Sequence, residues 1–312
     1  MRVFLAGATG VIGRRLIPLL LAAGHEVSGT TRSPAKSAGL RRAGADPVVV
    51  DALDGKAMHA AVLAAEPDAV IHQLTSLPPR IDPRKIERDF ALNDRLRGEG
   101  TRILMRAARD ASVERIVTQS IAFTYAPGPA DTLHRESDPL LTPAEVPAAY
   151  ARTAGAVIEL ERSVGESGGV VLRYGYFYGP GSSIASTGSI ADDLRRRRMP
   201  IVGGGGGVWS FVHVDDAAAA TVAALEVTAS SIYNIVDDDP APVAEWLPAL
   251  AGALGAPRPM RVPAWLARPL AGEYGVTVMT RAQGASNELA RRELDWIPAY
   301  PGWREGFRSA LG

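Results

Sequence analysis

The stretch RVFLAGATGVIGRRL, residues 2–16, decides the fold of this chain. A short apolar run leads into glycines at positions 7, 10 and 13, and an apolar stripe at helical spacing follows them. A strand, a glycine turn and a helix in that order open a dinucleotide-binding unit, in which bare backbone and helix N–H groups receive a pyrophosphate. A tight turn without a ligand is the alternative. We expect cofactor contacts from Gly7, Thr9, Gly10, Val11, Ile12 and Gly13.

The end of the second expected strand, TTRSPAK at residues 30–36, indicates which dinucleotide is bound. Sites for NAD usually carry an acidic residue about 20 residues beyond the glycines, where it bonds the ribose 2′-hydroxyl. Arg32 stands in that region here, and its guanidinium can pair with a 2′-phosphate. Ser33 followed by Pro34 is typical of a helix start, which adds N–H groups for the same phosphate. The sequence therefore favours NADP(H), with NAD(H) as the alternative.

Length and composition exclude several classes of protein. The 312 residues are 46% hydrophobic and can bury a large core. The formal net charge is zero, which favours neither nucleic acid nor an anionic membrane as a partner. No cysteine is present, which excludes disulfides, and the five histidines lack metal-ligand spacing, so we expect no metal. Apolar runs fall short of the ~20 residues of a membrane helix, and we expect a cytoplasmic protein.

Short apolar runs alternate with helical patterns through the first half of the chain, which is typical of a parallel sheet covered by helices. We expect an α/β fold: a Rossmann-type doubly wound parallel sheet with a smaller C-terminal substrate lobe. Residues 1–174 are expected to form the dinucleotide-binding domain and residues 175–312 mainly the lobe, with 209–236 returning to the Rossmann core. Two of the expected helices are long enough to supply a homodimer interface. Strands are expected at 2–6, 26–31, 47–50, 69–73, 115–120, 170–174, 209–214 and 231–236, and helices at 95–111, 148–164, 215–225 and 243–254.

Further motifs follow in a fixed order: DAVIHQL at 68–74, RIVTQSIAFTYAPG at 115–128, LRYGYFYGPG at 172–181, SFVHVDDAAAA at 210–220 and RRELDWIP at 291–298. With the glycine motif they resemble, nearly end to end, the extended short-chain dehydrogenase/reductase superfamily, also called NAD-dependent epimerases and dehydratases. The resemblance implies a small-molecule substrate and hydride transfer to or from a nicotinamide. It also implies cofactor contacts from Asp51 and Ala52 at the adenine end, from Gln73 and Leu74 after the fourth strand, and from Tyr174 and Tyr176 towards the nicotinamide.

The family's chemistry rests on a Ser or Thr, a Tyr, and a Lys four residues after that Tyr, and this chain departs from the pattern at two of the three positions. Tyr150 matches the tyrosine, which exchanges a proton with the substrate and also contacts the cofactor. The lysine position is Ala154, and the chain's lysines all lie in its first third. Ile121 occupies the hydroxyl position. The candidate is therefore Ser120, one residue early, whose alternative role is a strand-end hydroxyl bonded to backbone.

Relatives in this family that bind sugar nucleotides usually carry an arginine just before the FVHVDD segment, where this chain has Trp209. Trp209, Tyr125 and Phe177 are expected to contact a small, apolar, non-nucleotide substrate, although such rings can equally be lobe core. The expected function is an NAD(P)-dependent oxidoreductase with Tyr150 as proton donor. Two alternatives remain open: an NADP(H)-binding sensor or scaffold without catalysis, and an NAD(P)-dependent sugar epimerase or dehydratase.

Overall fold

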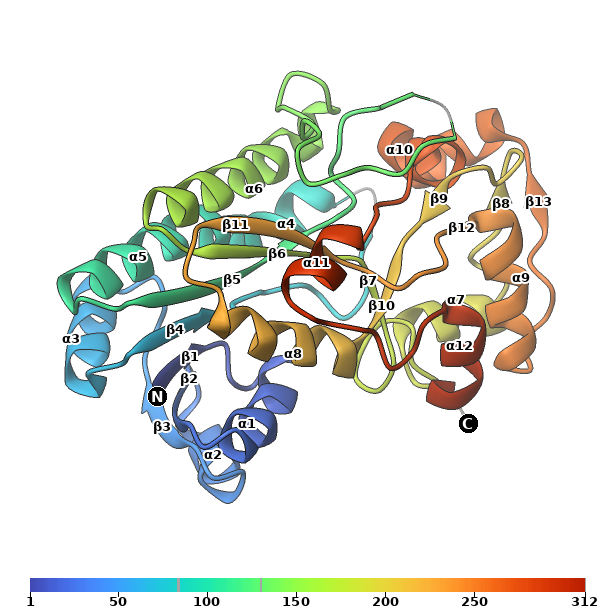
Figure 1. Cartoon of the computed structure of the whole chain (residues 1–312). Coiled ribbons are helices and arrows are strands. Elements are labelled where there is room, and N and C mark those ends of the chain that lie inside the picture. The colour runs from blue at the N-terminus through green and yellow to red at the C-terminus, as the bar shows by residue number, and fades with distance from the viewer. Residues whose placement is uncertain (83–84, 130, 312) are drawn as a thin grey trace.

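The computed structural model of the chain describes residues 1–82, 85–129 and 131–311. Its centre is a seven-stranded sheet in the order β11-β6-β5-β4-β1-β2-β3, in which neighbouring strands run parallel (Figure 1). The order reverses between β1 and β4, which is where a doubly wound sheet binds its ligand. The predicted α/β Rossmann-type fold is confirmed. The strands are β1 (Arg2–Ala6), β2 (Glu26–Thr31), β3 (Asp46–Val49), β4 (Ala69–His72), β5 (Arg115–Ile121), β6 (Val170–Tyr174) and β11 (Ser231–Ile235).

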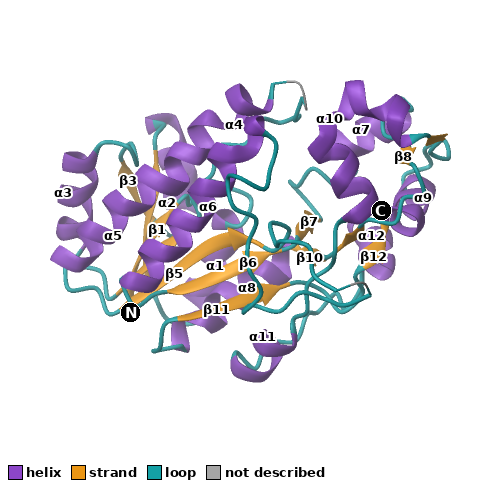
Figure 2. Cartoon of the chain, turned by 90° about the horizontal axis from the view of Figure 1, so that it is seen from above, coloured by secondary structure: helices purple, strands orange, loops and turns teal. Residues whose placement is uncertain are grey.

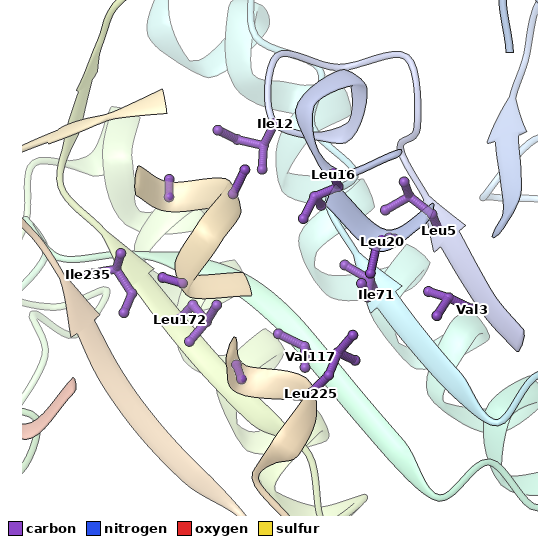
Figure 3. Packing of buried hydrophobic residues seen from close by; sticks show 14 of the residues in the cluster. Val3, Leu5, Ile12, Leu16, Leu20, Ile71, Val117, Leu172, Leu225 and Ile235 are labelled. Carbon is purple, nitrogen blue, oxygen red and sulfur yellow. The ribbon is translucent and has the colours of Figure 1, made fainter. Parts of the chain in front are cut away.

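Helices cover both faces of the sheet (Figure 2), because alternate strand residues carry apolar side chains to opposite sides. On one face, Leu16 and Leu20 of α1 lie in a core cluster with Val3 and Leu5 of β1 (Figure 3). On the other face, Phe4 lies in a second cluster with side chains of α3, α5 and α6. The first layer contains α1 (Gly13–Ala22), α2 (Ser37–Arg42), α8 (Val214–Ala223) and α11 (Glu288–Glu293), and the second contains α3 (Gly55–Ala65), α4 (Ile86–Arg95), α5 (Thr101–Asp110) and α6 (Ala148–Glu166).

The helix predicted at 95–111 belongs to a longer helical stretch. Five residues with π-helical bonding, Leu96–Gly100, join α4 to α5, so that the stretch begins at Ile86 and ends at Asp110. Single π turns inside helices frequently occur at functional sites. This one packs against α6 and carries the buried side chain of Arg97.

A lobe of helices and short strands lies beyond the carboxyl ends of the sheet strands (Figure 1). The strand predicted at 209–214 is divided at Ser210, because β9 pairs with β12 whereas β10 pairs with β7. Trp209 and Trp246 belong to the lobe core. The lobe and its junction with the sheet consist of β7 (Tyr176–Tyr178), α7 (Ser189–Arg195), β8 (Ile201–Val202), β9 (Val208–Trp209), β10 (Phe211–His213), β12 (Ala241–Pro242), α9 (Val243–Ala253), β13 (Arg261–Val262), α10 (Ala264–Arg281) and α12 (Trp303–Leu311).

Among the described residues, no helix has both the length and the apolar character that a membrane span requires. The homodimer expected through the helices at 95–111 and 148–164 stays a prediction. The division into domains at residue 174 also stays a prediction, although β11 and α8 do lie in the layers of the central sheet.

Candidate functional site

The glycine turn between β1 and α1 has a backbone shape that side chains would not allow. Gly7 has a φ of +93°, its N–H donates to Thr30 Oγ1 at 3.0 Å, and its carbonyl accepts from Gly10 N at 3.0 Å. A Cβ at Gly7 would lie 2.5 Å from the Gln73 carbonyl oxygen, and a Cβ at Gly13 would lie 2.3 Å from that of Gly7. Gly10 itself is exposed. The turn is therefore a cradle of bare backbone at the start of α1, and it fits the pyrophosphate of a dinucleotide cofactor.

Two arginines hold this turn in place. Arg14 Nε donates to the carbonyl of Thr9 at 3.0 Å. Arg15 donates to the carbonyl of Val11 at 2.9 Å and to that of Pro180, beyond β7, at 2.7 Å. The turn is thus tied to the segment that leads into the lobe. Of the predicted contacts in the turn, Thr9 and Val11 are half-buried and Ile12 is buried in the core beneath them (Figure 3).

The adenosine end of the expected cofactor site lies at the turns after β2 and β3. Arg32 is exposed, and it forms no hydrogen bond or ion pair within the part of the chain that the structure describes. Ser33 precedes a short 3-10 helix that begins at Pro34. Asp51 is exposed and its Oδ1 accepts a backbone N–H two residues further on at 3.0 Å, while Ala52 is buried. The Arg32 guanidinium is therefore available to a phosphate at this end.

The end of β4 contributes Gln73 and Leu74, which adjoin the glycine turn. Gln73 Nε2 donates to the Tyr174 hydroxyl at 3.0 Å, and that hydroxyl also lies 2.6 Å from Thr221 Oγ1. Burial raises the pKa of Tyr174 to about 12. Leu74 N donates to His72 Nδ1 at 3.2 Å, and burial lowers the pKa of His72 to about 4, so this imidazole is neutral. Tyr174 therefore supports Gln73 from within the core.

Ser120 and Tyr125 belong to one buried polar network beside β5. Ser120 Oγ donates to Glu161 Oε1 at 2.6 Å. Arg173 binds the same carboxylate with two bonds, of 3.0 Å from Nε and 2.7 Å from Nη2, and donates from Nη1 to the Tyr125 hydroxyl at 2.8 Å. That hydroxyl donates to Asn234 Oδ1 at 2.6 Å. The catalytic role predicted for Ser120 and the substrate contact predicted for Tyr125 stay predictions, and the structure engages both hydroxyls inside this network.

Tyr150 lies in the first turn of α6. Its ring packs against Tyr274 of α10, with ring centroids 4.1 Å apart and planes tilted by 34°. Burial, and then the neighbouring Tyr274, raises the pKa of Tyr150 to about 12, so its hydroxyl is protonated at neutral pH. One turn further along α6, Ala154 is buried, and Arg152 lies 3.6 Å from Glu87. The start of α6 therefore holds a protonated tyrosine hydroxyl, and Ala154 supplies no ammonium to lower the pKa of Tyr150. The predicted role of Tyr150 as proton donor stays a prediction.

Aromatic rings from five segments form what we call the aromatic wall: Phe123, Tyr150, Tyr176, Trp209 and Tyr274. The Tyr176 ring lies between two others, with its centroid 4.3 Å from that of Phe123 and 3.9 Å from that of Trp209. Burial raises the pKa of Tyr176 well above its usual value, and the nearby Tyr274 and Tyr150 add to the shift. Trp209 Nε1 donates to a backbone carbonyl of α10 at 3.2 Å. The wall therefore joins the start of α6 to the lobe.

Sequence reasoning did not identify every member of the wall. Of the three rings predicted to contact the substrate, Trp209 belongs to the wall, whereas Tyr125 and Phe177 lie outside it, and the predicted contacts stay predictions. Phe177 packs against the first core cluster, with its ring centroid 5.3 Å from that of Tyr174. Phe123 lies in the turn beyond the end of β5 at Ile121, so the alternation of strand side chains does not predict where its ring points. Tyr274 is far away in the sequence, in a segment without any motif, and only the folded chain brings it to Tyr150.

Comparison of the chain with known proteins identifies its family and a similar enzyme. The model of the NAD dependent epimerase/dehydratase family matches residues 3–236. A 3-diazoavenalumate denitrifying reductase of a Streptomyces species is 47% identical over 309 residues, which cover 98% of this chain and 99% of the relative.

Solved structures resemble the whole chain. UDP-glucose 4-epimerase of Thermus thermophilus, solved with NAD, is 25% identical, has a TM-score of 0.74, and is matched over 99% of this chain and 97% of its own. A human epimerase family protein, solved with NADPH, is 20% identical with a TM-score of 0.73 over 99% of both chains, and this likeness concerns the fold alone.

Proposed function

We propose that this chain, which belongs to the NAD dependent epimerase/dehydratase family, is an NADPH-dependent reductase that replaces the diazo group of a planar aromatic substrate by hydrogen. Family membership and 47% identity to a reductase over nearly the whole chain make it an NAD(P)-dependent oxidoreductase. The preference for NADPH and the identity of the substrate are our proposal. The observation that carries it is the pairing of a retained Tyr150 with Ala154 in the lysine position.

The proposed coenzyme preference rests on the two ends of the cofactor site. The glycine turn and the start of α1 receive the pyrophosphate through backbone N–H groups, whichever dinucleotide is bound. Arg32 is the group that distinguishes NADPH, because its exposed guanidinium can pair with the 2′-phosphate. When bound, the reduced nicotinamide supplies a hydride.

The loss of the lysine is explained by a substrate that needs no proton. When a hydride replaces an aryl diazonium group, the electron pair of the carbon–nitrogen bond leaves with N2. The electron pair of the hydride forms the new carbon–hydrogen bond. No proton is consumed in this exchange. Reduction of a ketone, in contrast, requires a proton on the developing alkoxide. A tyrosine whose pKa is raised to about 12 by burial is a poor choice for that proton transfer but an adequate hydrogen-bond donor to a substrate.

The aromatic wall supports a flat, aromatic substrate. Stacked and tilted aromatic pairs each contribute about 0.5–1.5 kcal/mol beyond the area that they bury. Tyr150 and Tyr274 present such a ring pair at the half-exposed end of the wall, whereas Trp209 stands where a nucleotide sugar would need an arginine. A sugar nucleotide is therefore disfavoured as the substrate.

Transfer of deuterium tests the proposal directly. The protein is incubated with NADPH that carries deuterium on the transferable position and with an aryl diazonium salt, beside a reaction without protein that measures spontaneous reduction. We expect protein-dependent formation of the arene with deuterium at the former diazo position and one N2 released per NADPH oxidised. Firm NADPH binding without any protein-dependent deuterium transfer would contradict the proposal and favour the sensor.

A second candidate, an NADPH-dependent carbonyl reductase, is favoured by the retention of Tyr150 in the first turn of α6. A panel of aromatic ketones and aldehydes, assayed with the wild-type protein and with Tyr150→Phe, distinguishes the two candidates. Carbonyl reduction that falls at least about a hundredfold in Tyr150→Phe identifies the second candidate, because general acid catalysis contributes ~10²–10⁴-fold.

A further inference from the structure

The side chain of Arg97 is a buried cation that has no bonded partner among the described residues. It lies in the π turn between α4 and α5, and only 8% of its surface is exposed. Within the described ranges its guanidinium forms no hydrogen bond and no ion pair, although burial of an unpaired charge is costly. Asp94, whose carboxylate lies near Arg97, also has a buried oxygen, Oδ1, without a hydrogen-bond partner among the described residues. This cluster therefore has unused hydrogen-bonding capacity.

The neighbours of Arg97 place it against the buried face of α6. Burial lowers its pKa, while the nearby carboxylates of Asp94 and Glu161 raise it. Asp94 accepts a hydrogen bond from Thr153 Oγ1 of α6 at 2.9 Å, and Thr153 directly precedes Ala154. Glu161 lies two turns further along α6 and is also buried. The guanidinium thus lies near two carboxylates. Asp94 is hydrogen-bonded to α6 just before the buried Ala154, and Glu161 belongs to α6 beyond it.

Arg97 also lies near the end of β4, whose last residue adjoins the predicted cofactor contacts. His72 ends β4, next to the predicted cofactor contacts Gln73 and Leu74, and Arg97 adds to the burial that lowers the pKa of His72. Arg97 therefore lies within electrostatic reach both of the end of β4 and of α6.

We propose that Arg97 supplies, from the neighbouring helix, the cation that Ala154 lacks, and that it holds the ribose hydroxyls next to the nicotinamide. The inference rests on the proposed binding of NADP(H). Arginine suits this role because its guanidinium stays charged and offers five donors in a rigid fork. Tyr150 owes its raised pKa to burial and Tyr274, with no contribution from Arg97. Arg97 therefore takes over the positioning of the ribose and leaves Tyr150 unactivated.

Coenzyme affinity provides a readout that does not depend on turnover. We compare NADPH and NADH binding, followed by quenching of tryptophan fluorescence, in the wild-type protein, Arg97→Met and Arg32→Ala. Because both coenzymes carry the same nicotinamide ribose, Arg97→Met is expected to weaken both by a similar factor, about tenfold or more, as for loss of a charged hydrogen bond. Arg32→Ala is expected to weaken NADPH alone. Arg95→Met, at an exposed arginine of α4, is the matched control and is expected to change neither affinity.

A second cation tests whether the position of the charge matters. Ala154→Lys introduced into Arg97→Met is expected to restore at least half of the lost affinity on a logarithmic scale for both coenzymes. If Arg97→Met does not fold, Arg97→Lys replaces it: the ammonium keeps the buried charge but loses the fork, and an equal, several-fold weakening of both coenzymes is expected.

The possible outcomes separate this inference from the proposed function. A wild-type protein that binds neither coenzyme overturns both. If the wild-type protein binds NADPH, two results in the folded Arg97 variants overturn the role of Arg97 alone. The first is unchanged affinity for both coenzymes, and the second is loss of affinity for NADPH only. Recovered thermal stability without recovered affinity in the double variant also overturns it, because a purely structural cation would behave in that way.

Discussion

The glycine turn and the start of α6 are both predicted parts of the cofactor site, and they are held in opposite ways. In the turn, Gly7 is fixed by backbone geometry and by one bond to Thr30, and the shape depends on the absence of side chains. At the start of α6, the Tyr150 ring packs against a ring from α10, and the hydroxyl of Thr153, next to Ala154, donates to Asp94 of α4. A region fixed by local backbone rules keeps its binding function, whereas a region assembled from distant side chains can exchange its members and change its chemistry.

The buried network around Glu161, which is also assembled from distant side chains, should show the largest loss of stability when one charge is removed. Arg173→Met leaves the Glu161 carboxylate buried without the guanidinium that donates two hydrogen bonds to it. Loss of one member of a buried ion pair lowers the free energy of unfolding by about 3–5 kcal/mol. Urea unfolding followed by circular dichroism measures the change. Arg162→Met, at an exposed ion pair on the same helix, is the control and should change the free energy of unfolding by less than about 0.5 kcal/mol. Equal effects of the two substitutions would show that the network is not a strong element of the fold.

The local region should lose binding when a single methyl group is added. Gly7→Ala places a Cβ 2.5 Å from a backbone oxygen at a residue whose φ is +93°, so the turn must change shape. We expect the affinities for NADPH and NADH to fall together by about a hundredfold, or about 2.7 kcal/mol. Gly39→Ala is the matched control, since Gly39 lies in α2 with open space around it. An unchanged coenzyme affinity in Gly7→Ala would refute the assignment of this turn to the cofactor.

The same contrast explains how much could be predicted from the sequence. The strands at 2–6, 26–31 and 170–174 begin and end as predicted, because apolar runs and glycine turns are local signals. The run at 209–214 reads as one strand, but the Ser210 hydroxyl accepts a bond from Ala285 N at 2.8 Å and the ladder divides there.

The candidate site divides along the same line. Its glycines, Tyr150 and the lack of a lysine at Ala154 are visible in the sequence, since each is defined by spacing within one segment. Arg97 and Tyr274 are not, because their importance comes from what they meet after folding. A charged residue in a polar helix and a tyrosine in the C-terminal third carry no local signal of burial.

A moderate effect on substrate binding is expected at Tyr274, the residue of α10 whose ring packs on Tyr150. Tyr274→Leu removes the ring that packs on Tyr150 but keeps an apolar side chain, so an aromatic substrate loses one pairing of about 0.5–1.5 kcal/mol. The KM for an aryl diazonium substrate should rise about two- to tenfold with little change in the KM for NADPH. Trp265→Leu, which alters an exposed ring of α10 on the other side of its kink at Gly272, is the control and should leave both KM values unchanged. A fall in kcat with constant KM would instead place Tyr274 in the chemical step.

The smallest effect should come from the residue that sequence reasoning placed at the centre of catalysis. Burial raises the pKa of Tyr150 to about 12, so its neutral form is favoured in the folded protein, and the associated stability is present below the ordinary tyrosine pKa of about 10 and lost as pH rises through about 12. Because diazo replacement consumes no proton, Tyr150→Phe should lower kcat less than about threefold, as for loss of one neutral hydrogen bond. The kcat profiles of the two proteins should also run parallel from about pH 6 to about pH 9, since Tyr150 does not titrate there. Steady-state rates across this range provide the measurement. A hundredfold loss in Tyr150→Phe on the diazonium substrate would mean that a proton is transferred after all, and that the start of α6 has kept its catalytic acid despite Ala154.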